Sequence, residues 1–182
     1  MTPLPQQRWN PRWQPGFWLA AGLGFGLDRL TKWWVVQTFV LTQPPQSWPL
    51  WPGVFHFTYV TNTGAAFSLF TQGSDWLRWL SLAVSLGLMG YALWGPRLHS
   101  WEQWAYGFIL AGAAGNGLDR FLLGHVIDFL DFRLIQFPIF NFADVAINLG
   151  LVCLIGYQWQ RDRRSPARPP LAESDKGHSQ EK

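Results

Sequence analysis

The chain has 182 residues, of which 48% are hydrophobic, including 13 Trp and 14 Phe, yet its mean hydropathy is zero. Apolar blocks are therefore offset by polar ends, a pattern that indicates a small membrane protein. The formal net charge is +3, and many of the basic residues lie near the two ends, so we interpret them as determinants of membrane orientation and expect no nucleic-acid binding. A single cysteine, Cys153, excludes an internal disulfide and a multi-thiolate metal site.

Four apolar stretches are close to the roughly 20 residues that a membrane-crossing helix needs. They run from about residue 17 to 39, 76 to 94, 101 to 123 and 139 to 159. We therefore predict a mainly α membrane protein, a four-transmembrane-helix bundle that occupies residues 17–160. Lys and Arg precede the first stretch, occur at Arg97 between the second and third, and follow the fourth. The positive-inside rule then predicts two cytoplasmic tails, 1–16 and a disordered 161–182.

Tryptophans near the predicted helix ends are expected to anchor the protein at the membrane interfaces. They are Trp33, Trp34, Trp76, Trp79, Trp101, Trp104 and Trp159. The first stretch has an alternative interpretation as a cleaved secretory signal, because Arg8 and Arg12 precede it. Asp28, Arg29 and Lys32 occupy the place of a small-residue cleavage site, which favours a retained helix.

The segment 40–75 is predicted to form a small β element on the extracytoplasmic side. Four prolines between residues 44 and 52 exclude a helix there. Phe55, Phe57 and Tyr59 then alternate along the chain, which is typical of a strand with one aromatic face.

Two carboxylates are predicted to meet near the outer boundary of the bilayer. Asp128 follows the third stretch on that side, and Asp144 lies about 8 Å from the outer end of the fourth. No Lys or Arg nearby in sequence provides an obvious counter-charge for either group. Such a pair in a poorly solvated site shares one proton, so the ionised member can activate water while the protonated member polarises a carbonyl. The protonation states belong to the pair, and neither residue is assigned a permanent role.

Other polar side chains share helical faces at spacings of three and four residues. The predicted faces are Asn116, Asp119 and Arg120 on the third helix, and Asn141, Asp144 and Asn148 on the fourth. For Asp28 with Lys32, and for Asp119 with Arg120 or Arg29, we favour the interpretation as ion pairs that hold the bundle together.

Five sequence blocks occur in order between positions 28 and 144. They are Asp28-Arg-Leu-Thr-Lys32, Asn62-Thr-Gly-Ala-Ala-Phe-Ser68, Gly115-Asn-Gly-Leu-Asp-Arg120, Gly124-His-Val-Ile-Asp-Phe129 and Phe140-Asn-Phe-Ala-Asp144. This set resembles the lipoprotein signal peptidases, the signal peptidase II family. The resemblance implies an intramembrane aspartic endopeptidase that removes the signal peptide from diacylglyceryl-modified prolipoproteins, cutting before the lipidated cysteine.

The resemblance also implies partners, location and site residues. It implies no metal and no other cofactor, prolipoprotein substrates, contact with membrane lipids, and a site near the extracytoplasmic surface of the bacterial inner membrane; a monomer is the expected state. By motif, Asp128 and Asp144 match the catalytic pair of the family. Residues expected to bind substrate or support the pair are Asp28, Lys32, Asn62, Gly64, Asn116, Asp119, Arg120 and Asn141.

Two positions within the matching blocks carry a further expectation. Gly64 is included because a glycine lets an extended peptide approach the backbone closely, with a tight turn as the alternative. Gly117 stands where a bulkier apolar residue is usual in the family, and we expect it to loosen the local helix packing.

Alternative functions remain open at this point. A proton-coupled transporter or small channel would also carry intramembrane carboxylates. Against it, Asp128 and Asp144 gather at one surface and no inverted repeat is visible. A protease of the presenilin or prepilin-peptidase kind is disfavoured because no Gly-X-Gly-Asp motif occurs. His56 and His125 are alternative bases, but they lack the spacing of a metal pair and are interpreted as interfacial polar residues.

Overall fold

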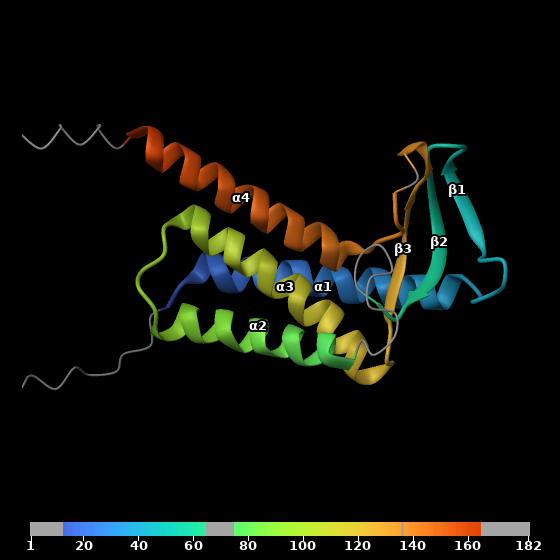
Figure 1. Cartoon of the computed structure of the whole chain (residues 1–182), viewed down its shortest axis with the longest axis horizontal. Coiled ribbons are helices and arrows are strands. Elements are labelled where there is room, and N and C mark those ends of the chain that lie inside the picture. The colour runs from blue at the N-terminus through green and yellow to red at the C-terminus, as the bar shows by residue number, and fades with distance from the viewer. Residues whose placement is uncertain (1–12, 65–74, 136, 165–182) are drawn as a thin grey trace, which may run out of the picture.

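The computed structural model describes residues 13–64, 75–135 and 137–164, which form a helical bundle with a small sheet at one end (Figure 1). The helices are α1 (Pro15–Thr38), α2 (Asp75–Trp94), α3 (Ser100–Leu122) and α4 (Phe142–Arg164), with a short 3-10 helix η2 (Arg133–Ile135). The strands are β1 (Ser47–Trp51), β2 (Phe55–Asn62) and β3 (Val126–Phe132). The predicted mainly α class with a small β element is confirmed.

The central helix is α3, which contacts α1, α2 and α4. Small residues allow this close packing, as they do between membrane helices in general. A Cβ added at Gly112 would overlap the main-chain carbonyl of Ala143 in α4, and one added at Gly117 would lie 2.9 Å from Cβ of Ser81 in α2. Our expectation that Gly117 loosens the packing is therefore wrong, because its missing side chain is what lets α2 approach.

The outer surface of the bundle is apolar, with exposed side chains that include Leu23, Leu86 and Ile155. By length and composition, α2 and α4 are suited to cross a membrane. The helices α1 and α3 have similar lengths of 24 and 23 residues, but they carry ionisable side chains, of which Asp28 and Asp119 are buried inside the bundle. Ionisable residues in membrane helices typically face the interior in this way.

The sheet has the order β1-β2-β3 and is antiparallel throughout. The predicted strand is confirmed as β2, and its Phe55, Phe57 and Tyr59 pack with Val35 of α1 and with Phe39, which follows that helix. The other two strands were not predicted. In β1, Pro49 is tolerated because this is an edge strand.

A three-residue turn that contains Gly124 connects α3 to β3. Helix α3 ends when the N–H of Leu123 bonds to the carbonyl of Asp119, and Gly124 follows with φ of +77°. A left-handed residue of this kind commonly ends a helix, and it turns the chain so that β3 runs across the end of the bundle (Figure 1).

The ends of α1 and α4 differ from those predicted. Helix α1 begins at Pro15, a residue favoured in the first turn. Helix α4 begins at Phe142 and not at 139, because Phe140 instead bridges to Leu130 of β3. It also continues to Arg164, four residues into the expected tail, and the guanidinium of Arg163 lies 3.7 Å from the ring of Trp159 one turn earlier. Residues 1–12 and 165–182 of the expected tails lie outside the described residues.

Of the seven tryptophans expected at helix ends, Trp34 and Trp104 are half-buried, and the ring centroid of Trp104 lies 5.9 Å from that of Phe108. Those at positions 33, 76, 79, 101 and 159 are exposed, in agreement with a role at the membrane interface. Trp34 is instead packed edge-on against Phe39 and Phe57, with ring centroids 5.8 and 5.3 Å away. It therefore contributes to the core between α1 and the sheet.

Candidate active site

The first turn of α4 fixes the position of Asp144. Asn141 precedes the helix, and its side-chain oxygen accepts the N–H of Asp144 at 3.0 Å. In return, the Asp144 carboxylate accepts the N–H of Asn141 at 3.1 Å. This reciprocal pair is a capping box with Asp in the third helical position. The local sequence thus orients the carboxylate before any contact with another helix is made.

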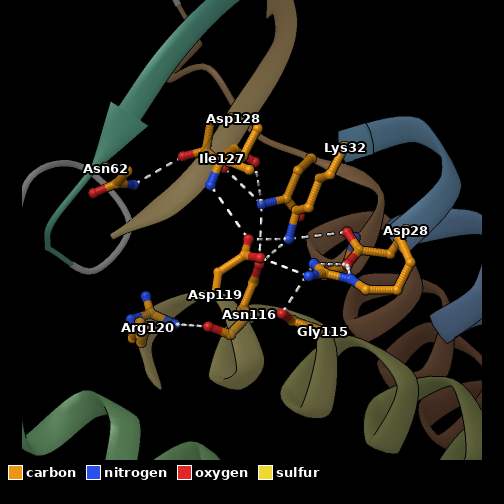
Figure 2. A network of polar contacts seen from close by, with 12 residues as sticks. Asp28, Lys32, Asn62, Gly115, Asn116, Asp119, Arg120, Ile127 and Asp128 are labelled. Atoms are coloured by element: carbon orange, nitrogen blue, oxygen red, sulfur yellow. Dashed lines mark hydrogen bonds and ion pairs between the residues drawn. The ribbon is translucent and has the colours of Figure 1, made fainter. Parts of the chain in front are cut away.

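Asp128 is carried by β3 and lies near the same helix end. Its two carboxylate oxygens accept hydrogen bonds from the amides of Asn141, at 2.6 Å, and of Asn62, at 3.0 Å. Asn62 is the last residue of β2, so the sheet pairing brings it alongside Asp128 (Figure 2). Residue Asp128 is only 2% exposed.

Two asparagines connect these carboxylates to the rest of the site. The Asn116 amide donates to Asp144 at 2.8 Å, and its oxygen accepts from Asn141 at 3.0 Å and from Nζ of Lys32 at 3.0 Å. Asn141 contacts both Asp128 and Asp144. The structure therefore brings together the two carboxylates that the sequence places 16 residues apart.

A buried network of ion pairs supports the site from the bundle side (Figure 2). Lys32 bonds Asp28 at 3.0 Å and Asp119 at 2.8 Å, and Arg29 also pairs with both, at 2.6 and 2.7 Å. Asp28 additionally accepts the N–H of Ala143, in the first turn of α4, at 3.0 Å. The predicted ion pairs of Asp28 with Lys32 and of Asp119 with Arg29 are thus present. The network ties α1, α3 and α4 together beneath the carboxylates.

In the described residues, Asp119 pairs with Arg29 and Lys32 and not with Arg120, the alternative partner considered from the sequence. The guanidinium of Arg120 donates to the carbonyl of Gly64 at 3.1 Å and to that of Asn116 at 3.4 Å. Its Nε is buried and has no hydrogen-bond partner within residues 13–64, 75–135 and 137–164. Gly64 in turn donates its N–H to Asn62, so a tight turn links Arg120 to the end of β2. Ala65 and Ala66, the next two residues of that motif, lie outside the described part of the chain.

A cavity of about 860 Å³ opens beside the carboxylates. Its polar wall consists of Asn62, Asn116, Arg120, Asp128 and Asp144. Its apolar walls are formed by residues 137–140, which lead into α4, and by side chains along α4 itself. The cavity therefore offers reactive groups at one end and a surface for hydrocarbon along the helix.

The electrostatic environment of Asp128 suits proton transfer. Burial, and to a smaller extent the negative charge of Asp144, raise the pKa of this carboxyl from 3.8 to about 6. The hydrogen bonds from Asn62 and Asn141 and the charge of Lys32 oppose the rise. No Lys or Arg forms an ion pair with Asp128 or Asp144 in the described part of the structure. A carboxyl that titrates this close to neutral pH can exchange protons with a substrate.

His56 and His125, the two histidines considered as alternative bases, lie outside the cavity that contains the carboxylates. His56 is in β2, where its ring bonds the Ser47 hydroxyl at 3.1 Å and accepts the N–H of Gly53 at 3.3 Å. Neither His56 nor His125 lines the cavity. Their interpretation as interfacial polar residues thus agrees with the structure better than a role as catalytic base.

Some parts of the site were missed from the sequence. Arg29 was named only as a partner of Asp119, although it also pairs with Asp28. Ile139 and Phe140 were assigned to the fourth helix, but they precede α4 and belong to the cavity wall at 137–140. The strand character of β3 was also readable from the β-branched and aromatic residues around Asp128.

Fold and site together define the class of protein: a membrane-embedded enzyme with paired carboxylates beside a partly apolar cavity. Two solved bacterial membrane enzyme structures share this fold, with TM-scores of 0.73 and 0.68 at 23% and 25% identity. The matches cover 87% and 84% of this chain and 97% of each solved chain. The family model for signal peptidase (SPase) II matches residues 20–160. The chain belongs to the signal peptidase II family and is a peptidase.

Curated relatives agree with this assignment. A lipoprotein signal peptidase from a Cyanothece species is 63% identical over 85% of this chain and 92% of its own length. The lipoprotein signal peptidase of Thermosynechococcus vestitus is 66% identical over 79% of this chain and 90% of its own length. The similarity thus spans nearly the whole of these relatives.

Proposed function

We propose that this chain is a membrane endopeptidase that removes the signal peptide from diacylglyceryl-modified prolipoproteins, cleaving before the lipidated cysteine with Asp128 and Asp144 as the catalytic pair. The observation that carries the proposal is the placement of these two carboxylates, held by asparagine amides and not by cations, at the wall of one cavity. Family membership and the names of the relatives support the substrate class.

In the proposed reaction, one water lies between the two carboxyls and the scissile carbonyl. The ionised carboxylate accepts a proton from this water as its oxygen attacks the carbonyl carbon, while the protonated carboxyl donates a hydrogen bond to the carbonyl oxygen. The tetrahedral intermediate collapses when the cysteine nitrogen leaves with a proton from the pair. The two carboxyls act as one titrating unit, so we assign the proton to the pair and not to either member.

The remaining predicted site residues support the pair or the substrate. Asn62, Asn116 and Asn141 donate to the carboxylates and so favour their ionised forms against the cost of burial. The network of Asp28, Lys32 and Asp119 holds Asn116 and the start of α4 in place. Arg120 lines the cavity and anchors the turn at Gly64, and we assign this pair to positioning the substrate backbone.

We further propose that the enzyme acts as a monomer in the bacterial inner membrane, with both termini in the cytoplasm and the site near the extracytoplasmic surface. The sheet and the carboxylates lie at one end of the bundle, and Arg97, between α2 and α3, lies at the other. Lipid-linked substrates would then enter sideways along the exposed apolar face of α4, with their acyl chains among the membrane lipids.

The ion-pathway alternative has less support. A transporter would use Asp28 as a binding group midway across the membrane. Asp28 is 0% exposed, and its oxygens accept from Lys32, Arg29 and the N–H of Ala143. A carboxylate with all its partners inside the protein is better suited to hold the bundle together.

The decisive experiment compares cleavage of a diacylglyceryl prolipoprotein in liposomes by wild type, Asp128→Asn and Asp144→Asn, with EDTA present. Each variant is expected to lose at least about a thousandfold in rate, because neither can complete the proton transfers of the pair. Thermal melting checks that each variant is folded. Asp131→Asn is the matched control: Asp131 is on the same strand but binds Thr58 and Arg133 and does not line the cavity. Normal cleavage by both folded variants would show that the proposed pair is wrong.

A further inference from the structure

Asn148 is a polar residue in the apolar part of the cavity. It lies on α4 one turn beyond Asp144, about 6 Å along the helix and away from the sheet. Its neighbours along the cavity wall on α4 are Asp144, one turn earlier, and the apolar Val145, Leu149 and Val152. Asn148 and Leu149 are both exposed. An amide among these side chains is not explained by the packing of the helix.

The side chain of Asn148 uses only part of its capacity to form hydrogen bonds. Its Nδ2 donates to the carbonyl of Asp144 at 2.9 Å, which fixes the side chain against the helix. A carboxamide has a second N–H donor and an oxygen acceptor. Neither has a further partner in the part of the chain that the structure describes. In a hydrocarbon environment an unused donor is costly, so a ligand that brings an acceptor gains from meeting it.

We infer that Asn148 binds an ester carbonyl of the diacylglyceryl group of the substrate and thereby sets the depth of the lipid relative to the carboxylates. This assignment rests on the proposed function. With the scissile bond beside Asp128 and Asp144, the thioether and glycerol that follow the cysteine pass into the apolar part of the cavity. The flexible single bonds between the cysteine and the ester carbonyl are long enough to bridge about 6 Å, the distance along α4 from Asp144 to Asn148. The acyl chains then continue along Leu149 and Val152.

An ester matches this position better than a peptide. An ester carbonyl only accepts hydrogen bonds, so one N–H from Asn148 satisfies it and no donor remains buried. A peptide group at the same depth would bring an N–H that needs an acceptor of its own. Asn148 is thus a specificity residue for the lipid, and the hydrogen bond distinguishes an ester-linked from an ether-linked chain.

The test uses two synthetic prolipopeptides that differ only in ester or ether linkage of equal alkyl chains, with wild type, Asn148→Leu and Leu149→Ala in lipid nanodiscs. Wild type is expected to favour the ester substrate by about three- to tenfold in kcat/KM, the value of one hydrogen bond, mainly through KM. In Asn148→Leu the ester substrate should fall to the level of the ether substrate. Leu149 lines the same cavity and has no polar group, so Leu149→Ala should affect both substrates alike and keep the preference for the ester.

Each outcome is decisive. Equal rates of wild type on both substrates, or an undiminished preference for the ester in folded Asn148→Leu, would overturn the assignment of Asn148 while the proposed function stands. Equal losses on both substrates in Asn148→Leu would also overturn it, because they indicate a structural role or a contact with the peptide. Failure of wild type to cut either substrate would remove the proposed function, and the assignment with it. Asn148→Gln, which keeps the amide, is expected to retain part of the preference.

Discussion

Two aspartates on one strand have different surroundings, and for this reason we propose a catalytic role for only one of them. Asp131 receives hydrogen bonds from Thr58 at 2.6 Å and from Arg133 at 2.8 Å, so its charge is compensated. Asp128, three residues earlier, receives only amide hydrogen bonds, and the negative charge of Asp144 acts on it. Burial without a cation is what raises its pKa. The residue type alone therefore does not distinguish the carboxylate that we propose as catalytic from the one that is ion-paired.

This environment predicts a change in the pKa of Asp128 when its neighbour loses its charge. Asp144→Asn removes the repulsion that opposes ionisation, so the Asp128 pKa should fall below its value of about 6. It should remain above 3.8 because burial, the larger cause, persists. The measurement is a pH titration of ¹³C-labelled aspartate carboxyls by NMR in detergent. Asp131→Asn is expected to leave the Asp128 pKa unchanged, and an unchanged or higher value in Asp144→Asn would contradict the electrostatic coupling.

Among the helices, α3 determines how closely the bundle packs. Gly112 faces Ala143 and Ile147 of α4, and Gly115 lies against Asp28 of α1, where an added Cβ would be 2.6 Å from a carboxylate oxygen. The same close approach brings Asn116 within reach of Asp144 at 2.8 Å. Helix packing and the geometry of the site thus depend on the same small residues.

We therefore predict that Gly112→Ala destabilises the protein by about 1–3 kcal/mol, because the new methyl group would have to displace the main-chain carbonyl of Ala143. Gly156→Ala is the control, since nothing lies within 4 Å of a Cβ at that position of α4. It should be neutral or stabilise the helix by up to about 1 kcal/mol. Thermal melting in one detergent compares the two. Equal melting temperatures for Gly112→Ala and wild type would contradict the close packing.

For the whole molecule, the arrangement of charges predicts an orientation in the membrane. The bundle end that carries the sheet has Arg133, whose guanidinium is bonded to Asp131 and to Ser47, and Arg78 in the first turn of α2, and these two residues weaken the charge bias without reversing it. The opposite end has Arg97, Arg161 and Arg163, followed in sequence by further basic residues. The larger number of basic residues at the end that we assign to the cytoplasm agrees with the positive-inside rule.

The expected result is a cytoplasmic C-terminus. A green fluorescent protein fused after Lys182 should fluoresce, and alkaline phosphatase at the same point should be inactive. Truncated fusions after Arg133, at the sheet end, should give the reverse pattern and serve as the control. Active phosphatase at Lys182 would contradict an even number of crossings with cytoplasmic ends, whatever the outcome of the cleavage assays.

Features of this protein that depend on neighbouring residues could be predicted from the sequence, whereas features that depend on contacts between distant segments could not. Three features are local: the lengths of the apolar stretches, the alternation at Phe55 and Phe57, and the capping box at Asn141 and Asp144. The first two were predicted, and the third depends only on residues that are close in sequence. The strand around Asp128 was missed because a strand needs a partner, and that partner is β2, more than 60 residues earlier. Likewise Gly117 has a packing role only because Ser81 lies against it.

The sequence by itself determined the membrane class and the approximate helices, and it singled out the two carboxylates that we propose as catalytic. Hydrophobic length, periodicity and motifs could be read because they are properties of residues close together in the chain. Only the tertiary structure decided that Arg29 pairs with Asp119 across 90 positions, and that Asp28 holds the first turn of α4 across 115. It also decided that Asn148 shares a cavity with the carboxylates. These contacts depend on how closely α1 and α4 pack against α3, and such packing is fixed by complementary surfaces from distant parts of the chain.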